Sequence, residues 1–391
     1  MRIAIFTDTY RPQINGVATS VHTLRNTLLA HGEEVLVVCP NPYYSELSFQ
    51  EGVLRVPGLE LKNLYDYRLS PARNKKAEAL IEEWKPDIIH IQTEMGIGMM
   101  GTHIAEHLHL PLVYTYHTMY EDYTHYATHG LGDQFAKALV RAFTRGKVRR
   151  VDEFITPSEK IKDYMRTIGV DVFVNVIPTG IDIESLNPKN VDMNKVKQLK
   201  SSLGLNERGK VILSLGRVAP EKSIDVLLKG YANYLSKKPK EKTVLLIVGG
   251  GPSLEGLQEL SQKLGIEKDV IFVGAVSPNE VQNYYQLGDI FVAASLTETQ
   301  GLTFMEAMAS RLLMLVRYDD SISGTISDQQ SGFFFFDEFD FSEKLEKVLS
   351  LSPKESEAIK DKAVAALAPY SLQLFYERIM EVYRRAIRKN W

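Results

Sequence analysis

Residues 290–308 read IFVAASLTETQGLTFMEAM. The apolar run 290–295 is typical of a strand buried in a parallel sheet, and the residues after Gly301 follow a helical pattern. Glu298 lies before this glycine, and Glu306 lies on the helix that follows it. The stretch therefore predicts one strand–turn–helix unit of an α/β fold, with two carboxylates beyond the carboxyl end of its strand.

Ligands bind at the carboxyl ends of the strands in open parallel sheets, so this turn is a candidate site. Carboxylates accept hydrogen bonds from vicinal hydroxyl groups, and the amides of Gly301, Leu302 and Thr303 can face a phosphate or a sugar. The alternative is an exposed loop acid, Glu298, and an ordinary glutamate in the first turn of a helix, Glu306. The position directly after a buried strand favours the sugar site.

The same alternation of apolar strand and helical segment recurs along the chain in two blocks. The apolar runs are residues 2–8, 34–40, 87–92, 112–117 and 153–158 in the first block, and 211–217, 243–250, 270–276 and 290–295 in the second. Nearly continuous apolar strands of this kind lie in parallel sheets that helices cover on both faces. We therefore predict an α/β protein with two Rossmann-like domains.

The length of the chain agrees with this division, because 391 residues exceed what one hydrophobic core usually organises. A polar stretch punctuated by proline and glycine, residues 178–200, separates the two blocks and is interpreted as the connection. The predicted domains are residues 1–180 and 190–365. The remaining segment, 366–391, is expected to form a helix at 372–389 that is apolar on one side and basic elsewhere.

The composition excludes several classes of protein. Hydrophobic residues make up 44% of the chain, and the formal net charge of -3 gives no reason to expect a nucleic-acid partner. The single cysteine, Cys39, lies in an apolar run, which favours a core residue and a reducing compartment. The sequence shows neither a signal-peptide pattern nor the roughly 18 consecutive apolar residues of a membrane span. We expect a cytosolic protein, or one attached to a membrane from one side.

Three residues at strand ends of the first block are candidates for binding. Asn15 and Gly16 follow the first strand and open a helix, where free backbone N–H groups and the helix dipole can hold an anion. The alternative, which this segment alone favours, is a plain turn. His117 ends the run 112–117 and can form a hydrogen bond to a sugar or a phosphate, although a lone histidine is more often structural.

The second block offers cations at comparable positions. Gly216 and Arg217 end one apolar run, and Lys222 lies near the start of the next helix. Two fixed cations there could offset the negative charge that develops on a departing diphosphate. The alternative is a solvated basic loop. Gly250, within a run of three glycines after the next strand, is interpreted as part of a loop near the nucleotide.

Motifs for other kinds of catalysis are absent from the sequence. The chain contains no Asp-x-Asp pair, no histidine and cysteine cluster with zinc spacing, no serine elbow and no Walker-type phosphate loop. A transferase that holds a diphosphate with Arg, Lys and backbone amides does not need a divalent cation. We therefore expect neither a metal nor a cofactor at the site.

Together these motifs resemble the retaining GT-B glycosyltransferases of family 4. The matching residues are Asn15-Gly16, His117, the PTGID run at 178–182, Gly216-Arg217 with Glu221-Lys222, the GGGP run at 249–252, and Glu298 with Glu306. Each motif alone is common, but the ordered combination is specific and extends over nearly the full chain. The resemblance implies two Rossmann-like domains whose parallel sheets face each other across a cleft, with a C-terminal helix that crosses back to the N-terminal domain.

The resemblance also implies a role for each group of the donor site. Arg217 and Lys222 hold the donor diphosphate. Glu306 binds the nucleotide ribose. Glu298 and the amides of residues 301–303 contact the donor sugar.

The family resemblance further implies that His117 lies beside the sugar and Gly16 near the phosphates. Such enzymes are thought to retain the anomeric configuration by attack on the same face, and the leaving phosphate helps to deprotonate the acceptor. No protein nucleophile is then required. One position departs from the pattern, because Arg311 stands where the family usually has a glycine. This departure concerns the local packing more than the chemistry.

Within the family, residues 92–94 and 117–123 look like those of bacterial enzymes that glucosylate diacylglycerol. A lipid acceptor requires contact with a membrane, and segment 133–152 has a suitable pattern. Between its two terminal aspartates it carries only basic charges, at Lys137, Arg141, Arg145, Lys147, Arg149 and Arg150. On a helix, Phe135, Leu139, Ala142 and Phe143 fall on one side and Lys137, Arg141 and Arg145 on another. Such a basic amphipathic helix suits an anionic membrane surface. The alternative is that the apolar side belongs to the core and the cations are solvated.

The resemblance thus predicts a retaining, metal-independent hexosyltransferase that moves glucose from UDP-glucose to the 3-hydroxyl of 1,2-diacylglycerol. The expected product is an α-linked glycolipid, and the expected location is peripheral, at the inner face of the cell membrane. Neither a nucleic-acid partner nor an oligomer is expected to be required. The alternatives are a soluble sugar, a polysaccharide or an already glycosylated lipid as acceptor, and a non-catalytic sugar-nucleotide-binding protein.

Overall fold

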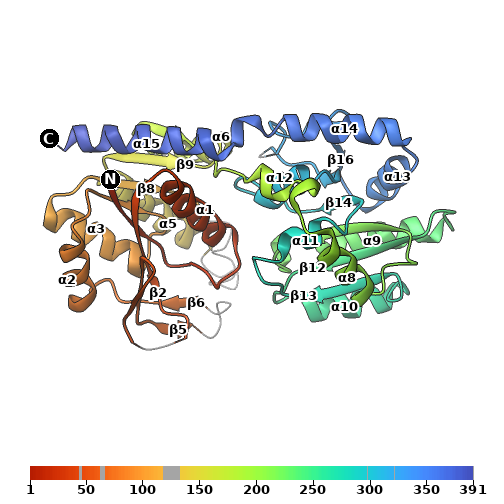
Figure 1. The fold of residues 1–391 in the computed structure, drawn as a ribbon, viewed down its shortest axis with the longest axis horizontal. Coiled ribbons are helices and arrows are strands. Elements are labelled where there is room, and N and C mark those ends of the chain that lie inside the picture. The colour runs from red at the N-terminus through yellow and green to blue at the C-terminus, as the bar shows by residue number, and fades with distance from the viewer. Residues whose placement is uncertain (44–45, 62–66, 118–132, 297, 321, 391) are drawn as a thin grey trace. The chain divides into compact units, whose positions relative to one another are not determined.

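The computed structural model describes residues 1–43, 46–61, 67–117, 133–296, 298–320 and 322–390. This part of the chain divides into two compact units. Unit 1 comprises Met1–Gly180 together with the segment that begins at Leu372, and unit 2 comprises Ile181–Ser371. Each unit is built around its own parallel sheet (Figure 1).

Unit 1 contains an eight-stranded sheet with the strand order β10-β9-β8-β7-β1-β2-β4-β3. The bounds are β1 Arg2–Phe6, β2 Glu34–Pro40, β3 Ser48–Gln50, β4 Val53–Val56, β7 Ile88–Ile91, β8 Leu112–Thr115, β9 Glu153–Thr156 and β10 Val174–Val176. Neighbouring strands are parallel, except that β3 at the edge runs antiparallel to β4. A separate antiparallel pair is formed by β5 (Leu59–Leu61) and β6 (Tyr67–Leu69).

Helices cover both faces of this sheet, because successive side chains of a strand point to opposite sides. Ile3 and Ile5 of β1 pack into one core, whereas Ala4 and Phe6 pack into the other. The first core is covered by α1 (Gly16–Ala30) and α15 (Leu372–Lys389). The second is covered by α2 (Lys75–Trp84), α3 (Gly96–Leu108), α6 (Glu159–Thr167) and the end of α5 (Asp133–Val148).

The C-terminal helix α15 belongs to unit 1, although it follows unit 2 in the sequence. It lies alongside α1 in Figure 1, where the two helices have the colours of opposite chain ends. Its apolar side is buried against the sheet, and Tyr383 at its centre is fully buried. The expected return of the C-terminal helix to the N-terminal domain is therefore confirmed.

Unit 2 contains a six-stranded sheet with the order β13-β12-β11-β14-β15-β16, in which every pair is parallel. The bounds are β11 Lys210–Leu215, β12 Thr243–Val248, β13 Val270–Gly274, β14 Ile290–Ala293, β15 Leu313–Arg317 and β16 Phe333–Phe335. One face packs against α9 (Ile224–Ser236), α10 (Leu254–Lys263) and α13 (Glu338–Leu349). The other packs against α7 (Ile183–Leu186), α8 (Met193–Ser202), α11 (Val281–Tyr285), α12 (Leu302–Ala309) and α14 (Pro353–Ala365).

The predicted connection at 178–200 differs from the structure in its extent. Leu186, Val191 and Val196 are buried in a core of unit 2, so most of this polar stretch is part of that unit. The chain leaves unit 1 after Gly180. A β-bridge between Ile181 and Ser371 holds together the first and last residues of unit 2. Because most residues of α7 and α8 are polar, the sequence did not predict the few apolar positions that pack against the sheet.

Candidate active site

The loops that follow β11 and β12 approach each other so closely that only glycine fits. A Cβ atom on Gly249 would lie 1.8 Å from the carbonyl oxygen of Gly216, and one on Gly251 would lie 2.2 Å from that of Val218. Gly216, Gly249 and Gly251 also have φ values of 148°, 143° and 155°, a region that L side chains rarely adopt. The glycines therefore bring the loops that hold Gly216 and Gly250 together at the carboxyl edge of the sheet of unit 2.

Both predicted cations of unit 2 are paired with carboxylates. Nζ of Lys222, at the end of the short 3₁₀ turn Pro220–Lys222, lies 2.6 Å from Oε1 of Glu298 in the loop after β14. Arg217 pairs with Glu221. The Lys222 side chain is 30% exposed and that of Glu298 13%, so the pair is open to solvent on one side. A ligand that carries two phosphates could therefore compete for these cations without unfolding the turn.

The first turn of α12 lies next to the end of β11. A Cβ atom on Gly216 would come within 3.9 Å of Cγ2 of Thr303. Gly301, the N-cap residue of α12, has φ 76° and no side chain that could cap the helix. The amides of Leu302 and Thr303 in this first turn are thus placed to bind an anion or a hydroxyl oxygen.

Glu306 lies one turn further along α12 and is held by a tyrosine that the sequence analysis did not identify. The hydroxyl of Tyr285 donates a hydrogen bond of 2.7 Å to Oε2 of Glu306. Burial raises the pKa of Glu306 to about 7, although the bond from Tyr285 acts in the opposite direction. Tyr285 ends α11, and no sequence motif pointed to it, because a tyrosine in a short helix reads as a core residue.

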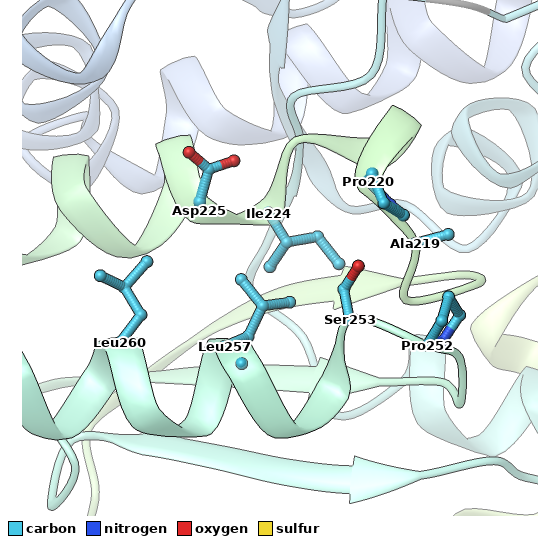
Figure 2. A pocket seen from close by; sticks show the side chains of 9 residues that line it. Ala219, Pro220, Ile224, Asp225, Pro252, Ser253, Leu257 and Leu260 are labelled. Atoms are coloured by element: carbon cyan, nitrogen blue, oxygen red, sulfur yellow. The ribbon is translucent and has the colours of Figure 1, made fainter. Parts of the chain in front are cut away.

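A cavity of about 300 Å³ opens beside these loops, between α9 and α10. Leu257 and Leu260 project from α10 toward α9, and Pro220 and Pro252 lie at the end nearer the glycine loops (Figure 2). Its lining is mainly apolar, with Asp225 and Ser253 as polar residues. The predicted donor-binding residues do not line it, so the cavity is a neighbour of the candidate site and not the site itself.

Unit 1 places the other predicted residues at the carboxyl edge of its own sheet. Oδ1 of Asn15 accepts a 2.8 Å hydrogen bond from the amide of Ala18, which caps α1, and the Asn15 amide donates to Oγ1 of Thr9. A Cβ atom on Gly16 would meet nothing within 4 Å. Packing within the described structure therefore does not require glycine at position 16, and the open space agrees with a ligand there.

His117 lies two residues beyond the end of β8, next to a buried glutamine. Its Nε2 is 2.6 Å from Oε1 of Gln92, which follows β7. Burial lowers the pKa of His117 to about 4, so the ring is neutral near pH 7. Gln92 belongs to the 92–94 stretch that the sequence singled out, but its contact with His117 depends on the pairing of β7 with β8.

Helix α5 exposes the apolar side that the sequence predicted. Phe135, Leu139 and Phe143 are 71%, 55% and 48% exposed, whereas Thr144 and Val148 on another side are buried. The alternative, in which the apolar side belongs to the core, is therefore wrong for these residues. The cations Arg141, Arg145, Arg149 and Arg150 are exposed, and Lys137 is half-buried.

Lys147 corrects one part of the predicted basic surface. Its side chain is buried, and its Nζ donates a 3.0 Å hydrogen bond to the backbone carbonyl of Glu94. Lys147 therefore attaches the last turn of α5 to the loop after β7 and is not available to a membrane surface. Helical periodicity places a residue on a side of a helix, but it does not show which side faces the domain.

Two further structural findings concern the described residues. None of the helices there is both long and apolar enough to cross a membrane. Within the same residues, no group of three or more histidine, cysteine, aspartate or glutamate side chains is arranged to hold a metal ion.

Two family models match the chain. One, described as Glycosyltransferase Family 4, covers residues 14–185, and the other, Glycosyl transferases group 1, covers residues 195–364. A relative from Streptococcus pneumoniae is 35% identical over all 391 residues and 87% of its own length. One from Acholeplasma laidlawii is 33% identical over the whole chain and 98% of its own length. Both relatives are named alpha-monoglucosyldiacylglycerol synthase.

Solved structures with the same fold are much more distant in sequence. Sucrose-phosphate synthase from Thermosynechococcus elongatus matches with a TM-score of 0.75 at 16% identity, over 99% of each chain. HepE from Anabaena, solved in complex with UDP-glucose, matches with a TM-score of 0.72 at 16% identity, over 97% of this chain and 98% of that one. These similarities confirm the GT-B type of α/β fold expected from the sequence.

Proposed function

Since this chain belongs to glycosyltransferase family 4, we propose that it transfers glucose from UDP-glucose to the 3-hydroxyl of 1,2-diacylglycerol, with retention of the anomeric configuration. The bond between C1 of glucose and the phosphate oxygen breaks, and a bond forms from C1 to the acceptor oxygen on the same face. The acceptor proton passes to the leaving phosphate. The products are UDP and α-monoglucosyldiacylglycerol.

The arrangement of unit 2 supports a sugar nucleotide as donor. In our proposal Lys222 and Arg217 bind the diphosphate, and the amides of residues 301–303 assist them. The phosphates compete for Lys222, and Glu298 can then exchange its 2.6 Å ion pair for hydrogen bonds from sugar hydroxyls. Glu306 binds the ribose hydroxyls. Charge on the departing UDP is thus balanced without a metal, and chelators should leave the activity unchanged.

The observation that carries the lipid acceptor is the exposed apolar side of α5. Phe135, Leu139 and Phe143 form an apolar stripe on a helix whose exposed charges are basic. Such a helix can lie in the interface of an anionic membrane, with the rings among the acyl chains and the guanidinium groups at the phosphates. The names of the two full-length relatives agree with this acceptor. We propose a peripheral location at the inner face of the cell membrane.

Transfer to a defined membrane tests this function. The protein is incubated with UDP-glucose, UDP-galactose or GDP-mannose over anionic vesicles that contain diacylglycerol, and the lipid products are analysed. We expect a single α-linked glucolipid from UDP-glucose. Transfer only to water-soluble acceptors, without vesicle binding, would contradict the lipid acceptor and support the same fold acting on a soluble sugar or polysaccharide.

The same assay separates an enzyme from a non-catalytic sugar-nucleotide-binding protein. Lys222→Ala removes one of two cations at the diphosphate, so we expect kcat to fall by about a hundredfold or more, the scale found for one electrostatic contact to a developing charge. Lys229→Ala is the matched control, since Lys229 forms an exposed pair with Asp225 on α9. Equal donor binding and transfer by the Lys222 variant and the parent would remove the phosphate role assigned here.

A further inference from the structure

A chain of hydrogen bonds crosses the interior of unit 1 from the C-terminal helix to His117. The hydroxyl of Tyr383 on α15 lies 2.7 Å from Nδ1 of His90 in β7. Nε2 of His90 lies 3.0 Å from the amide nitrogen of Gln92, and the amide oxygen of Gln92 lies 2.6 Å from Nε2 of His117. Tyr383, His90 and Gln92 are at most 2% exposed. Nothing in the proposed reaction uses these three residues directly.

The carboxamide of Gln92 fixes which atom donates and which accepts in each of these hydrogen bonds. Its oxygen can only accept, so Nε2 of His117 must carry the proton and donate. Its nitrogen can only donate, so Nε2 of His90 must be unprotonated. The proton of His90 is then on Nδ1, which donates to the Tyr383 oxygen.

Both rings carry a single proton, which makes the tautomers definite. Burial lowers the pKa of His90 to about 3 and that of His117 to about 4, so both are neutral near pH 7. The hydroxyl of Thr115, 2.7 Å from Nε2 of His90, also serves as a donor to the unprotonated nitrogen. A neutral histidine with Nε2–H has a lone pair on Nδ1. Within the described residues, the Gln92 bond is the one hydrogen bond of His117.

We propose that Gln92, His90 and Tyr383 are positioning residues that hold His117 in its Nε2-protonated tautomer, so that Nδ1 accepts a hydrogen bond from a hydroxyl of the transferred sugar. This inference rests on the proposed function, because it assigns the partner of His117 in that reaction. It excludes a neutral His117 that donates from Nδ1 to a phosphate. It also makes α15, which enters unit 1 from the far end of the chain, part of the machinery that orients the sugar.

The effect of one distant substitution follows from the network. In Tyr383→Phe the His90 Nδ1–H loses its acceptor inside the protein, a loss that favours the other tautomer, in which Nε2–H donates to Thr115. The proton on Nε2 of His90 then faces the NH2 group of Gln92, which is also a donor. The carboxamide of Gln92 therefore flips, so that its oxygen faces His90 and its nitrogen faces His117. His117 must then accept at Nε2 and carry its proton on Nδ1. A change on α15 thus reverses the donor and acceptor atoms of His117.

Nitrogen NMR of protein labelled at its 9 histidines reads the tautomers directly. We expect Nε2–H for His117 in the parent, with His117→Gln used for assignment, and Nδ1–H in Tyr383→Phe. Gln92→Met, which keeps the length of the side chain, should give a mixture. Tyr376→Phe is the matched control, because Tyr376 lies on the same helix but donates to Glu33. It should leave the His117 signal unchanged.

Kinetics test the positioning role. We expect Tyr383→Phe to lower kcat about tenfold with the KM for UDP-glucose within twofold, while Tyr376→Phe matches the parent. UDP-glucose analogues that each lack one hydroxyl identify the sugar hydroxyl that binds His117. The analogue without this hydroxyl should be a poor donor for the parent, and Tyr383→Phe should not lower its kcat further. Melting curves of all variants, expected to shift by only a few degrees because each loses one or two hydrogen bonds, separate this effect from loss of folding.

The outcomes distinguish this inference from the proposed function. Nδ1–H on His117 in the parent, or an unchanged His117 tautomer in Tyr383→Phe, overturns the inference. A reversed tautomer with unchanged kcat also overturns it. Absence of transfer to diacylglycerol by the parent would contradict the proposed acceptor, but it would leave the spectra as predicted.

Discussion

Arg311 adopts a backbone conformation that favours glycine, with φ 61°, directly after Ser310 at the C-cap of α12. Its guanidinium contacts Glu357 at 2.8 Å and Asp361 at 2.7 Å, both on α14. The left-handed conformation costs a non-glycine residue about 1 kcal/mol, and two largely exposed ion pairs return a similar amount. The departure from the family pattern is therefore compensated locally, behind the candidate donor site.

Two substitutions at position 311 separate the cost of the left-handed conformation from the gain of the ion pairs. Arg311→Gly removes the strain and the ion pairs together, so we expect its thermal midpoint to stay within a few degrees of the parent. Arg311→Ala loses the pairs but keeps the strain, and it should be less stable than the glycine variant by about 1 kcal/mol. Differential scanning calorimetry measures the difference. An alanine variant at least as stable as the glycine variant would contradict the assigned strain.

Glu306 makes donor binding dependent on pH. Its pKa is raised by burial to about 7, so roughly a tenth of the molecules carry the carboxylate at pH 6 and about nine-tenths at pH 8. The ionised form accepts ribose hydrogen bonds more strongly. We therefore expect the KM for UDP-glucose to fall several-fold as the pH rises through 7, because the donor diphosphate itself does not titrate there.

Glu306→Gln provides the control, since a carboxamide does not titrate. Its KM should be higher than that of the parent at pH 8 and nearly constant from pH 6 to 8. A pH dependence that survives in this variant would assign the titration to another group.

The residues proposed for the site could be selected from the sequence because each follows an apolar strand. Nothing in the sequence selected Tyr285, which donates a hydrogen bond to Glu306. Its role comes from the packing of α11 on α12 and leaves no pattern in the sequence.

Several predicted strands extend beyond the strands of the structure at their carboxyl ends. The runs 2–8, 112–117 and 211–217 end in the structure at Phe6, Thr115 and Leu215. The first residue beyond each end, Thr7, Tyr116 or Gly216, still donates a backbone hydrogen bond to a neighbouring strand. Asp8, His117 and Arg217, one position further on, lie outside the strands. Apolar patterning predicts where a strand lies, whereas the end of the pairing depends on where neighbouring strands diverge.

The exposed apolar side of helix α5 leads to a prediction about membrane binding. Replacing Phe135, Leu139 and Phe143 by serine removes three large exposed side chains, each worth about 1–2 kcal/mol when buried in the interface. We expect binding to diacylglycerol vesicles with anionic lipid to weaken by about a hundredfold or more in sedimentation assays. Transfer to vesicle-bound acceptor should fall in parallel, with the fold unchanged by circular dichroism.

Phe339→Ser serves as the control for this variant. Phe339 is 67% exposed on α13 of unit 2, so it tests the loss of an exposed aromatic ring elsewhere. Binding of the parent should also weaken as salt rises, because the arginines of α5 act through screened charges. Vesicle binding by the triple variant that equals the parent would exclude α5 as the membrane contact.

At the scale of the whole molecule, two blocks of strands predicted two sheets, and a third segment predicted the last helix with the bounds that α15 has, Leu372–Lys389. Amphipathic periodicity is strong in this long helix, so its extent was readable. The contacts that attach this helix to unit 1 could not be predicted from the sequence. Glu153, at the start of β9, is 2% exposed and lies far away in the sequence. Its partners on α15 were visible only as part of a generally basic helix.

Glu153 fastens α15 through several partners at once. Its carboxylate accepts bonds from Arg385 at 3.1 Å and Asn175 at 2.9 Å, and it forms an ion pair with Lys389 at 3.0 Å. Burial by itself would raise the pKa of Glu153, but these partners outweigh it and hold the pKa below its usual value. The stabilisation is thus present above the unfolded pKa near 4.5 and is lost as the pH falls through the lower folded value.

Glu153→Gln should therefore loosen α15 at neutral pH. Removing the charge leaves Arg385 and Lys389 without their buried counter-ion, and because both cations are partly solvated we expect a cost of about 1–3 kcal/mol. Hydrogen exchange of the α15 amides should accelerate about tenfold or more, while that of α13 in unit 2 stays unchanged. Glu381→Gln removes an exposed partner of the same arginine and should have little effect. Equal protection of α15 in both variants would mean that apolar packing alone holds the helix.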